Sequence, residues 1–385
     1  MIKTTTFITA IAALFTVLSF QSCSKDALIA EVQPTPEEPE ELEIRFGLRG
    51  TNVTEVVSRG TTITLDDIPN VGLYGYYTAN ERWTWSADNQ PAALKPNYFC
   101  NETLQKSGVS GAYSWSYQGV PRFWPPDTSN KVSFFAYSPY VETVDGEGNP
   151  IDLTGQAVVP YPAIASETGF PTLRYTLPAN IANHIDVLRA ANIDMTKYGA
   201  DGIAATADDG MVPMIMEHAL TQITFSAEYA NADDEENYTV LINSVALTGI
   251  YNQGTLRLDN GQWLFEADAE KASIAIQGRD LAGEVVEDGN KIYHLLNPAL
   301  GTLMLIPQPL AASSLVIEAT FRDPDPLKDD VTATIAFALE DTGYKWEPGK
   351  SIDYRIRIKG GFISVHTTIR PWIAYGSGLS GGAGL

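Results

Sequence analysis

The chain contains the segment ALTQITFSAEYA at residues 219–230, followed by YTVLINSVALTG at 238–249 and GTLRLDNGQWLFE at 254–266. All three are rich in the β-branched and aromatic residues that favour strands, and turn-forming Asn, Asp and Gly residues separate them. Similar runs recur at residues 120–140, 301–310, 314–323, 331–340 and 351–360. Many short strands with turns between them are typical of β-sandwiches, so the sequence predicts an all-β protein.

The first predicted strand lies closer to the N-terminus and shows a period of two. Leu42, Ile44, Phe46 and Leu48 alternate with polar or small residues, as in a strand with one buried face. The loop RGTNVTEVVSRG follows at residues 49–60, and an aromatic strand is expected at 71–77.

A secretory signal is predicted upstream of this strand. Lys3 supplies a basic start, residues 7–20 form an apolar run, and Cys23 follows a small-residue ending. A cysteine in this place is what a bacterial lipoprotein pathway acylates, so we expect residues 1–22 to be removed and Cys23 to carry lipid. The alternatives are an ordinary secretory signal and a membrane anchor, for which the run is shorter than the ~20 apolar residues that spanning requires.

The chain divides by composition into five parts. After the signal, residues 23–41 form an acidic, proline-rich linker. The acidic insertion TKYGADGIAATADDG, at residues 196–210, separates an aromatic-rich half from the later strands. We therefore expect an N-terminal β-sandwich domain at 42–210, a C-terminal one at 211–376 and a flexible Gly-rich tail at 377–385.

Charge and cysteine content exclude several kinds of partner. The chain has 47 acidic and 25 basic residues and a net charge of -22, whereas nucleic-acid binding requires a basic surface. Its two cysteines are Cys23 and Cys100, so with Cys23 acylated no disulfide framework is possible. Cys100 is expected to be a buried or half-buried small residue, because no Cys-His pairing surrounds it.

No motif of catalysis, metal binding or cofactor binding is present in the sequence. The four histidines lack metal-ligand spacing, and no HExxH, GxSxG, GxxxxGK or paired CxxC motif occurs. Asp201, Asp208 and Asp209 lack the spacing of a calcium loop, so a solvated acidic loop is the preferred interpretation. We therefore predict a protein without metal or cofactor that is not an enzyme. The histidines are His184, His218, His294 and His366.

Aromatic residues in the predicted loops suggest a second possible function. Surface aromatics stack on sugars, so a surface lipoprotein that binds a glycan or a host ligand is the alternative function, although large aromatics more often fill a core. A glycosidase is the least supported class, since nothing in the sequence positions two carboxylates for that reaction. The residues concerned are Trp83, Trp85, Tyr113, Trp115 and Tyr117.

Taken together, motifs along the whole chain resemble those of the fimbrillin family, the lipoprotein-derived subunits of type V pili. The resemblance is carried by the order and spacing of many loose motifs rather than by one of them. They are Cys23, NVGLYGYYT at 70–78, FWPPDTSNKVSFFAYSPY at 123–140, DVLRA at 186–190, MEHALTQITFSAEY at 216–229, LTGIYNQGTLRL at 247–258, WEPGKSIDYRIRI at 346–358 and ISVHTTIRPW at 363–372.

The resemblance implies two tandem transthyretin-like β-sandwich domains and a role as a fimbrial subunit or surface lipoprotein. In such pilins the precursor reaches the outer membrane as a lipoprotein, and an arginine-specific protease cuts in the loop after the first strand. Here the cut would fall between Arg59 and Gly60, or alternatively between Arg49 and Gly50. The leaving strand would be the one that carries Leu42, Ile44, Phe46 and Leu48.

The family's assembly mechanism also implies a donor segment from the next fimbrial subunit, which fills the groove left by the first strand. The candidate donor contains Ile363, Val365, Thr367 and Ile369, which alternate in a period of two. The alternative is that residues 362–375 form the last strand of their own domain. A role as stalk, tip or anchor subunit of the fimbria stays open.

Overall fold

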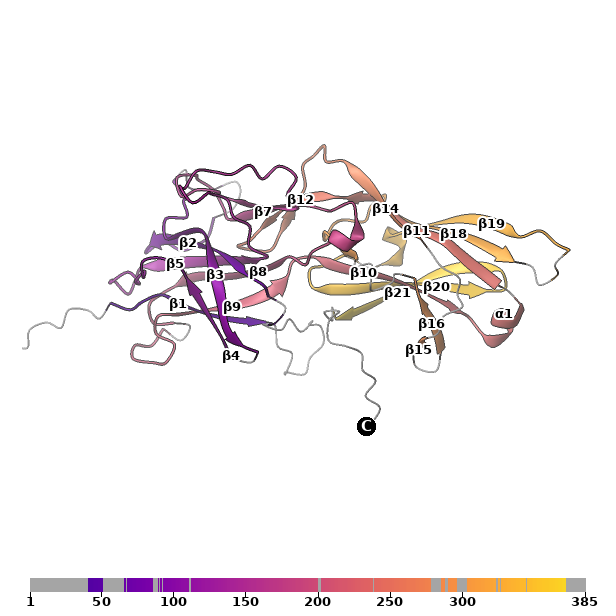
Figure 1. Ribbon diagram of the computed structural model, residues 1–385, viewed down its shortest axis with the longest axis horizontal. Coiled ribbons are helices and arrows are strands. Elements are labelled where there is room, and N and C mark those ends of the chain that lie inside the picture. Colours follow the sequence, from indigo (N-terminus) through magenta and orange to yellow (C-terminus); the bar gives the residue numbers. More distant parts are fainter. Residues whose placement is uncertain are drawn as a thin grey trace, which may run out of the picture. The chain divides into compact units, whose positions relative to one another are not determined.

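The fold is built almost entirely from strands (Figure 1). The computed structural model describes residues 41–50, 66, 68–85, 89, 91, 93–110, 112–199, 202–237, 239–277, 285–287, 290–295, 303–322, 325, 327–343 and 345–371. The segment from Glu41 onward forms one unit by itself. No helix in the described residues is long and apolar enough to cross a membrane. The predicted all-β class is confirmed.

The first half of the chain forms a closed sheet. Its strands pair antiparallel except for the first and last, which pair in parallel and close the ring. In spatial order the described strands are β1 (Arg45–Gly50), β4 (Ala112–Tyr117), β3 (Phe99–Val109), β2 (Val71–Ala79), β5 (Lys131–Ser138), β8 (Leu188–Met195) and β9 (Met211–His218).

The second half forms two further sheets. One has the order β15 (Val285–Glu287), β16 (Asn290–His294), β10 (Thr221–Tyr229), β20 (Lys350–Lys359) and β21 (Phe362–Pro371), with β17 (Leu303–Leu305) also paired to β10. The other has the order β14 (Lys271–Gln277), β11 (Thr239–Tyr251), β18 (Ser314–Arg322) and β19 (Val331–Ala338). The short helix α1 (Ala232–Asn237) links β10 to β11.

A small fourth sheet joins strands from both halves of the sequence. It has the order β13 (Trp263–Leu264), β12 (Gln253–Arg257), β7 (Thr172–Thr176) and β6 (Val158–Tyr161). Strand β7 pairs with β12 through five residues, from Thr172 opposite Arg257 to Thr176 opposite Gln253. The two halves are thus connected by main-chain hydrogen bonds as well as by the linking chain.

Strands β2 and β5 are buried on both faces, which explains their nearly continuous apolar sequences. In β5, Val132 and Phe134 face the core inside the closed sheet, whereas Phe135 and Tyr137 face the larger core that continues into the second half. Glycines in β2 make room for this packing: a Cβ at Gly75 would lie 2.7 Å from the Phe99 ring. Both cores therefore depend on the same two strands.

A buried ion pair stabilises the contact between β12 and the loop after β2. The side chains of Arg257 and Asp259 are 5% and 4% exposed and form a salt bridge. The indole N–H of Trp83 donates to the same carboxylate at 3.1 Å, and the Arg257 guanidinium lies 3.8 Å from the centre of the Phe170 ring. Removing two charges from water is costly, and the cost is offset here because each charge has a partner of opposite sign.

Strand pairing changes the predicted outline of the first half. Strand β9 begins at Met211, where the sequence suggested that the second domain starts, but it pairs with β1 and β8 of the closed sheet. The change of sheet comes after His218, so the first half extends further than residue 210. Residues 180–192 contain the short 3-10 helix η1 (Ile181–Asn183) and the start of β8. Division into two domains stays a prediction.

Candidate functional site: the first strand and its slot

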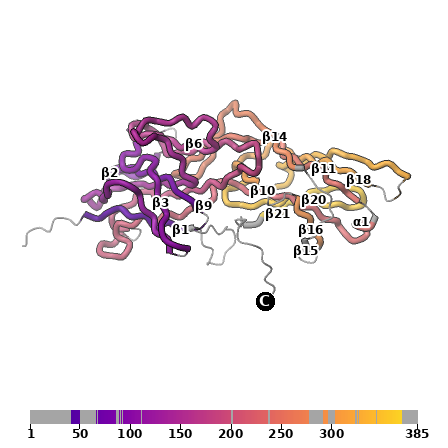
Figure 2. Tube along the Cα trace, viewed as in Figure 1, coloured from indigo at the N-terminus to yellow at the C-terminus, as the bar shows by residue number. Residues whose placement is uncertain are grey.

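Strand β1 lies between β9 and β4 in the closed sheet. Figure 2 labels β1 and β9. On one side it pairs in parallel with β9 over six positions, from Arg45 opposite Met211 to Gly50 opposite Met216. On the other side it pairs with β4 at a single position, Phe46 opposite Trp115. The strand is therefore held mainly by β9, a segment more than 160 residues further along the chain.

The residues just before β1 add main-chain contacts. The N–H of Ile44 donates to the carbonyl of Arg122 at 2.8 Å, and the N–H of Trp124 donates to the carbonyl of Leu42 at 2.9 Å. The Arg45 guanidinium donates to the carbonyl of Asp209 at 2.7 Å. The first two bonds place the residues before β1 against the loop that precedes β5, and the third places Arg45 against the loop that precedes β9.

The side chains of this segment alternate as the sequence predicts. Ile44 is fully buried, Phe46 and Leu48 are each 5% exposed, and Leu42 packs at the border of the same core. Arg45, between Ile44 and Phe46, and Arg49, after Leu48, are exposed. The regular strand begins at Arg45 rather than at Leu42, because residues 42–44 bond to the loop at 122–124 instead of to a strand.

The Phe46 ring occupies a cage of three aromatic rings. Its centre lies 5.6 Å from that of Phe99, 6.1 Å from that of Tyr117 and 5.5 Å from that of Phe134, each in an edge-to-face arrangement. These three rings come from β3, β4 and β5, so they surround Phe46 from three strands. We call this set of three residues the aromatic cage.

The predicted donor residues lie in β21, which forms a hairpin with β20. The two strands pair antiparallel over ten positions, from Lys350 opposite Pro371 to Lys359 opposite Phe362. Ile363, Val365 and Thr367 are half-buried, and Ile369 is 40% exposed. Among the described strands β21 is the edge of its sheet. In this structure residues 362–371 thus form the last strand of their own sheet, as the alternative hypothesis expected. A donor role for this strand stays a prediction.

The processing residues divide between described and undescribed parts of the chain. Arg49 and Gly50 are the last two residues of β1 and pair with Ile215 and Met216 of β9. Cys23, Arg59 and Gly60 lie outside the described residues.

Two of the four histidines make contacts within the fold. His218 is 6% exposed, and its Nδ1 lies 2.6 Å from a carboxylate oxygen of Asp186. The N–H of Met304 donates to Nδ1 of His184 at 3.3 Å, so Nε2 of that ring carries the proton and donates to the carbonyl of Pro178 at 3.0 Å. Burial lowers the pKa of His184. His294 lies in β16 and His366 in β21.

The acidic loop is held by its own hydrogen bonds. The hydroxyl of Thr206 donates to Asp208 at 2.7 Å and to Asp209 at 3.1 Å, and the N–H of Ala205 donates to Asp209 at 2.8 Å. Asp201 lies outside the described residues. Across the described parts of the chain, no group of three or more His, Cys, Asp or Glu side chains is arranged to hold a metal ion.

The aromatic residues assigned to loops are mostly parts of the cores, which corrects the basis of the glycan-binding hypothesis. Trp83 is 8% exposed and packs 5.3 Å from Trp85, and Trp115 is 7% exposed. Tyr113, Trp115 and Tyr117 belong to β4 rather than to a loop. Trp83 and Trp85 thus pack in one core and Trp115 and Tyr117 in the other, whereas Tyr113 is half-buried and belongs to neither core.

Cys100 is half-buried, as predicted. Burial raises the pKa of its thiol to about 12, so the reactive thiolate is scarce at neutral pH.

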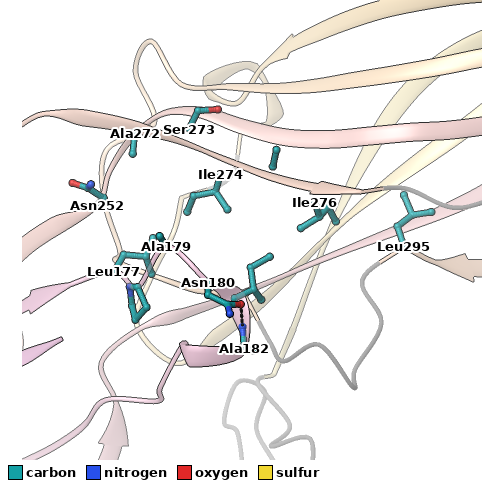
Figure 3. A pocket seen from close by; sticks show the side chains of 13 residues that line it. Leu177, Ala179, Asn180, Ala182, Asn252, Ala272, Ser273, Ile274, Ile276 and Leu295 are labelled. Atoms are coloured by element: carbon teal, nitrogen blue, oxygen red, sulfur yellow. Dashed lines mark hydrogen bonds between the residues drawn. The ribbon is translucent and has the colours of Figure 1, made fainter. Parts of the chain in front are cut away.

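A pocket of about 670 Å³ lies between β14 and the segment that contains η1 (Figure 3). Ile274 and Ile276 of β14 line one side, and Leu177 and Asn180 line the other. The Asn180 side chain is engaged, because it accepts a hydrogen bond from the N–H of Ala182 at 3.0 Å. No acidic, basic or histidine side chain lines the pocket, so its described lining offers no acid-base chemistry.

Comparisons with known proteins agree with this architecture. The pairings of the described strands define an all-β protein with one closed sheet and three open sheets. The chain belongs to the fimbrillin-like family, which matches residues 59–372. The predicted resemblance is therefore confirmed. No curated protein matches the chain.

Several solved structures are similar. A fimbrial protein from Bacteroides vulgatus has 20% identity and a TM-score of 0.59, with 86% of this chain and 99% of that chain covered. A putative cell adhesion protein from Bacteroides eggerthii has 13% identity, a TM-score of 0.48 and coverages of 86% and 96%. The fimbrial anchor protein Mfa2 from Porphyromonas gingivalis has 11% identity, a TM-score of 0.36 and coverages of 86% and 98%. The likeness to the first shows a shared fold.

Proposed function

We propose that this protein is a non-enzymatic structural subunit of a cell-surface fimbria, assembled by proteolytic removal of β1 and its replacement by a strand from another subunit. Membership of the fimbrillin-like family supports the fimbrial part. The observation that carries the exchange is that β1, the first described strand, fills an apolar slot in a closed sheet.

Removal of β1 would leave two kinds of unsatisfied surface. The β9 edge would lose main-chain partners at six positions, and the inner core would lose the side chains of Ile44, Phe46 and Leu48. Unpaired backbone groups and exposed apolar side chains both raise the free energy of the cut subunit. An extended segment with apolar residues at every second position satisfies both, which is the physical basis of strand addition.

The pairing of β1 favours Arg59 over Arg49 as the cleavage point. Arg49 lies within β1, and its backbone pairs with Ile215 of β9. Proteases cut preferentially where the backbone is exposed and unpaired. A cut after Arg59 also leaves the whole of β1 on the fragment that departs.

The lipid anchor belongs to the precursor. With Cys23 acylated, the chain would be held at the outer membrane as a lipoprotein, and residues 24–41 would space the folded part from the lipid. The cut that releases β1 separates Cys23 from the rest of the protein. The mature subunit would then be retained at the cell surface by other fimbrial subunits, whereas an anchor subunit would keep its lipid.

The edge hairpin supplies the donor in this proposal. Strand β21 is bonded to β20 alone among the described strands, and the side chains of Ile363, Val365, Thr367 and Ile369 form one row on it. An edge strand is released with the loss of a single ladder of hydrogen bonds. The same strand then supplies a ladder to the β9 edge of the next subunit.

Mild trypsin treatment of the lipid-free precursor tests the proposal. We expect one cut after Arg59, with a new N-terminus at Gly60, followed by a ladder of SDS-resistant oligomers. Arg59→Ala should fold normally and remain monomeric, and the matched control Arg49→Ala should assemble like the unaltered protein. Normal assembly of Arg59→Ala, or a cut protein that stays monomeric, contradicts the proposal.

A further inference from the structure

A second pocket, of about 650 Å³, lies among three segments of the second half of the chain. Trp263 and Phe265 line it from β13 and the residue that follows this strand, residues 307–311 line it after β17, and residues 345–348 line it before β20. Sites for small ligands are commonly clefts of about 300–1,000 Å³ with a mostly apolar lining and a few polar groups. We call this cavity the loop pocket, and its size is that of a ligand site.

Two half-buried aromatic rings border the loop pocket and are held from outside it. The indole N–H of Trp263 donates to the carbonyl of Ala219 at 2.9 Å, and its ring lies edge-to-face with Tyr175 at 6.3 Å. The Phe265 ring stacks on Tyr251 with the centres 4.5 Å apart. Tyr251 does not line the pocket, so the part of Phe265 that does is the part that Tyr251 leaves uncovered. The two rings are therefore fixed apolar surfaces, and a ligand that packs on them orders little side-chain motion.

Charged side chains at the rim supply both kinds of hydrogen-bonding group. Glu340, Lys345 and Glu347 line the pocket and are exposed. Their side chains form no hydrogen bond or ion pair with the rest of the described chain, so they are available to a ligand. The two carboxylates accept hydrogen bonds and the ammonium group donates them. Because a hydroxyl both donates and accepts, a ligand rich in hydroxyls finds a partner at each of these groups.

This combination fits a sugar ring better than other ligands. A pyranose has an apolar C–H face, which packs on an aromatic ring, and a periphery of hydroxyls. The rim carries two carboxylates and one ammonium group, and the whole chain has a net charge of -22, so an anionic sugar would be repelled. Strand addition by a peptide is disfavoured here, because β13 comprises only Trp263–Leu264.

We propose that the loop pocket binds a neutral glycan. A pyranose ring packs on Trp263 and Phe265, and its hydroxyls form hydrogen bonds with Glu340, Lys345 and Glu347. Because no residue of β1, of β9 or of the aromatic cage lines the pocket, this adhesive function is separate from the proposed exchange of β1.

A glycan-binding measurement on the full lipid-free chain tests this assignment. The fluorescent protein is applied to immobilised neutral oligosaccharides of hexoses, N-acetylhexosamines and fucose, to their sialylated and sulfated versions, and to a peptide of alternating lysine and proline. We expect binding to at least one neutral oligosaccharide and weaker binding to its anionic versions. The neutral oligosaccharide that binds best is then titrated by calorimetry.

Variants of the loop pocket connect the binding to its residues. Trp263→Ala and Glu347→Ala should each bind at least about tenfold more weakly, because one removes an aromatic surface and the other a charged acceptor. The matched controls Phe362→Ala and Glu147→Ala, at exposed residues outside the pocket, should bind like the unaltered protein. Melting curves show which variants fold, and Glu347→Ala decides if Trp263→Ala does not, because Glu347 is exposed.

Three outcomes overturn the inference. They are the absence of binding to every neutral oligosaccharide, an unchanged affinity of Glu347→Ala or of folded Trp263→Ala, and binding to the peptide alone, which would assign the pocket to a basic segment of a protein.

The variant Arg59→Ala keeps this test separate from that of the proposed function. It should bind the oligosaccharide like the unaltered protein, although it does not assemble. Normal assembly without glycan binding would refute the glycan site and leave the fimbrial subunit intact. Glycan binding by a protein that never assembles would refute the proposed polymer and retain the glycan site.

Discussion

Replacing Phe46 by Ala tests whether β1 is a structural strand of the closed sheet. Phe46 is 5% exposed, and three aromatic rings surround its side chain. The substitution removes the ring and leaves the cage empty. We expect a large loss of stability together with easier opening of β1.

The magnitude follows from the packing around the ring. Truncation of a buried Phe to Ala costs about 3–5 kcal/mol, depending on how far the site collapses. The cage residues are fixed by β3, β4 and β5, so collapse is limited and the upper part of that range applies. The free energy of unfolding should therefore fall by about 4–5 kcal/mol. Phe362→Ala, at a side chain that is 79% exposed, is the matched control and should change it by less than about 0.5 kcal/mol.

Urea denaturation followed by tryptophan fluorescence measures the global loss, and hydrogen exchange measures the β1 amides separately. The second readout is needed because β1 can open as a local unit without global unfolding. In that case Phe46→Ala accelerates exchange in residues 45–50 while the urea midpoint shifts less. If both the midpoint and the exchange rates match those of Phe362→Ala, the described packing of β1 is wrong.

Asp259→Ala should lower the free energy of unfolding by about 3–5 kcal/mol in urea titrations, because it takes the partner from the buried Arg257 charge. The Cys100 thiol, whose pKa burial raises to about 12, should react with a thiol reagent at about pH 8 much more slowly in the folded protein than in urea. Burial lowers the pKa of His184 in the folded protein, so as the pH falls the unfolded chain binds a proton at this residue before the folded chain does. The neutral His184 ring therefore stabilises the fold above about pH 6.5, and this stabilisation is lost as the pH falls below that value. The decline, read from melting curves, should be smaller in His184→Gln, and an equal decline would contradict the assignment.

Local patterns were sufficient to predict these strands, because a strand is indicated by the alternation and the β-propensity of residues that are adjacent in sequence. The aromatic strand expected at 71–77 is β2, Val71–Ala79, and the alternation at 42–48 matches the buried row of β1. Periodicity also located the edge strand β21. It did not distinguish a donor from a resident strand, because both show the same period of two.

The burial of Trp83 and Trp115 depends on contacts with residues far away in the sequence, which a local sequence pattern does not indicate. Trp83 follows a strand in a stretch that resembles a loop, yet its indole N–H bonds to Asp259, which is 176 residues away. Trp115 pairs opposite Phe46 on β1. Composition alone therefore suggested an exposed aromatic surface where the structure has two cores.

The sequence by itself determined the all-β class and the alternating first strand, since both depend on residue order over short distances, and it determined the likeness to the fimbrillin family through the order of motifs along the chain. Only the tertiary structure decided that β9 closes the first sheet, that β1 pairs with it in parallel, and that Phe46 sits in a cage made by three other strands. The physical reason is that strand partners and ring contacts between distant segments are selected by how the whole chain buries its apolar side chains. That selection is not encoded in any single stretch of the chain.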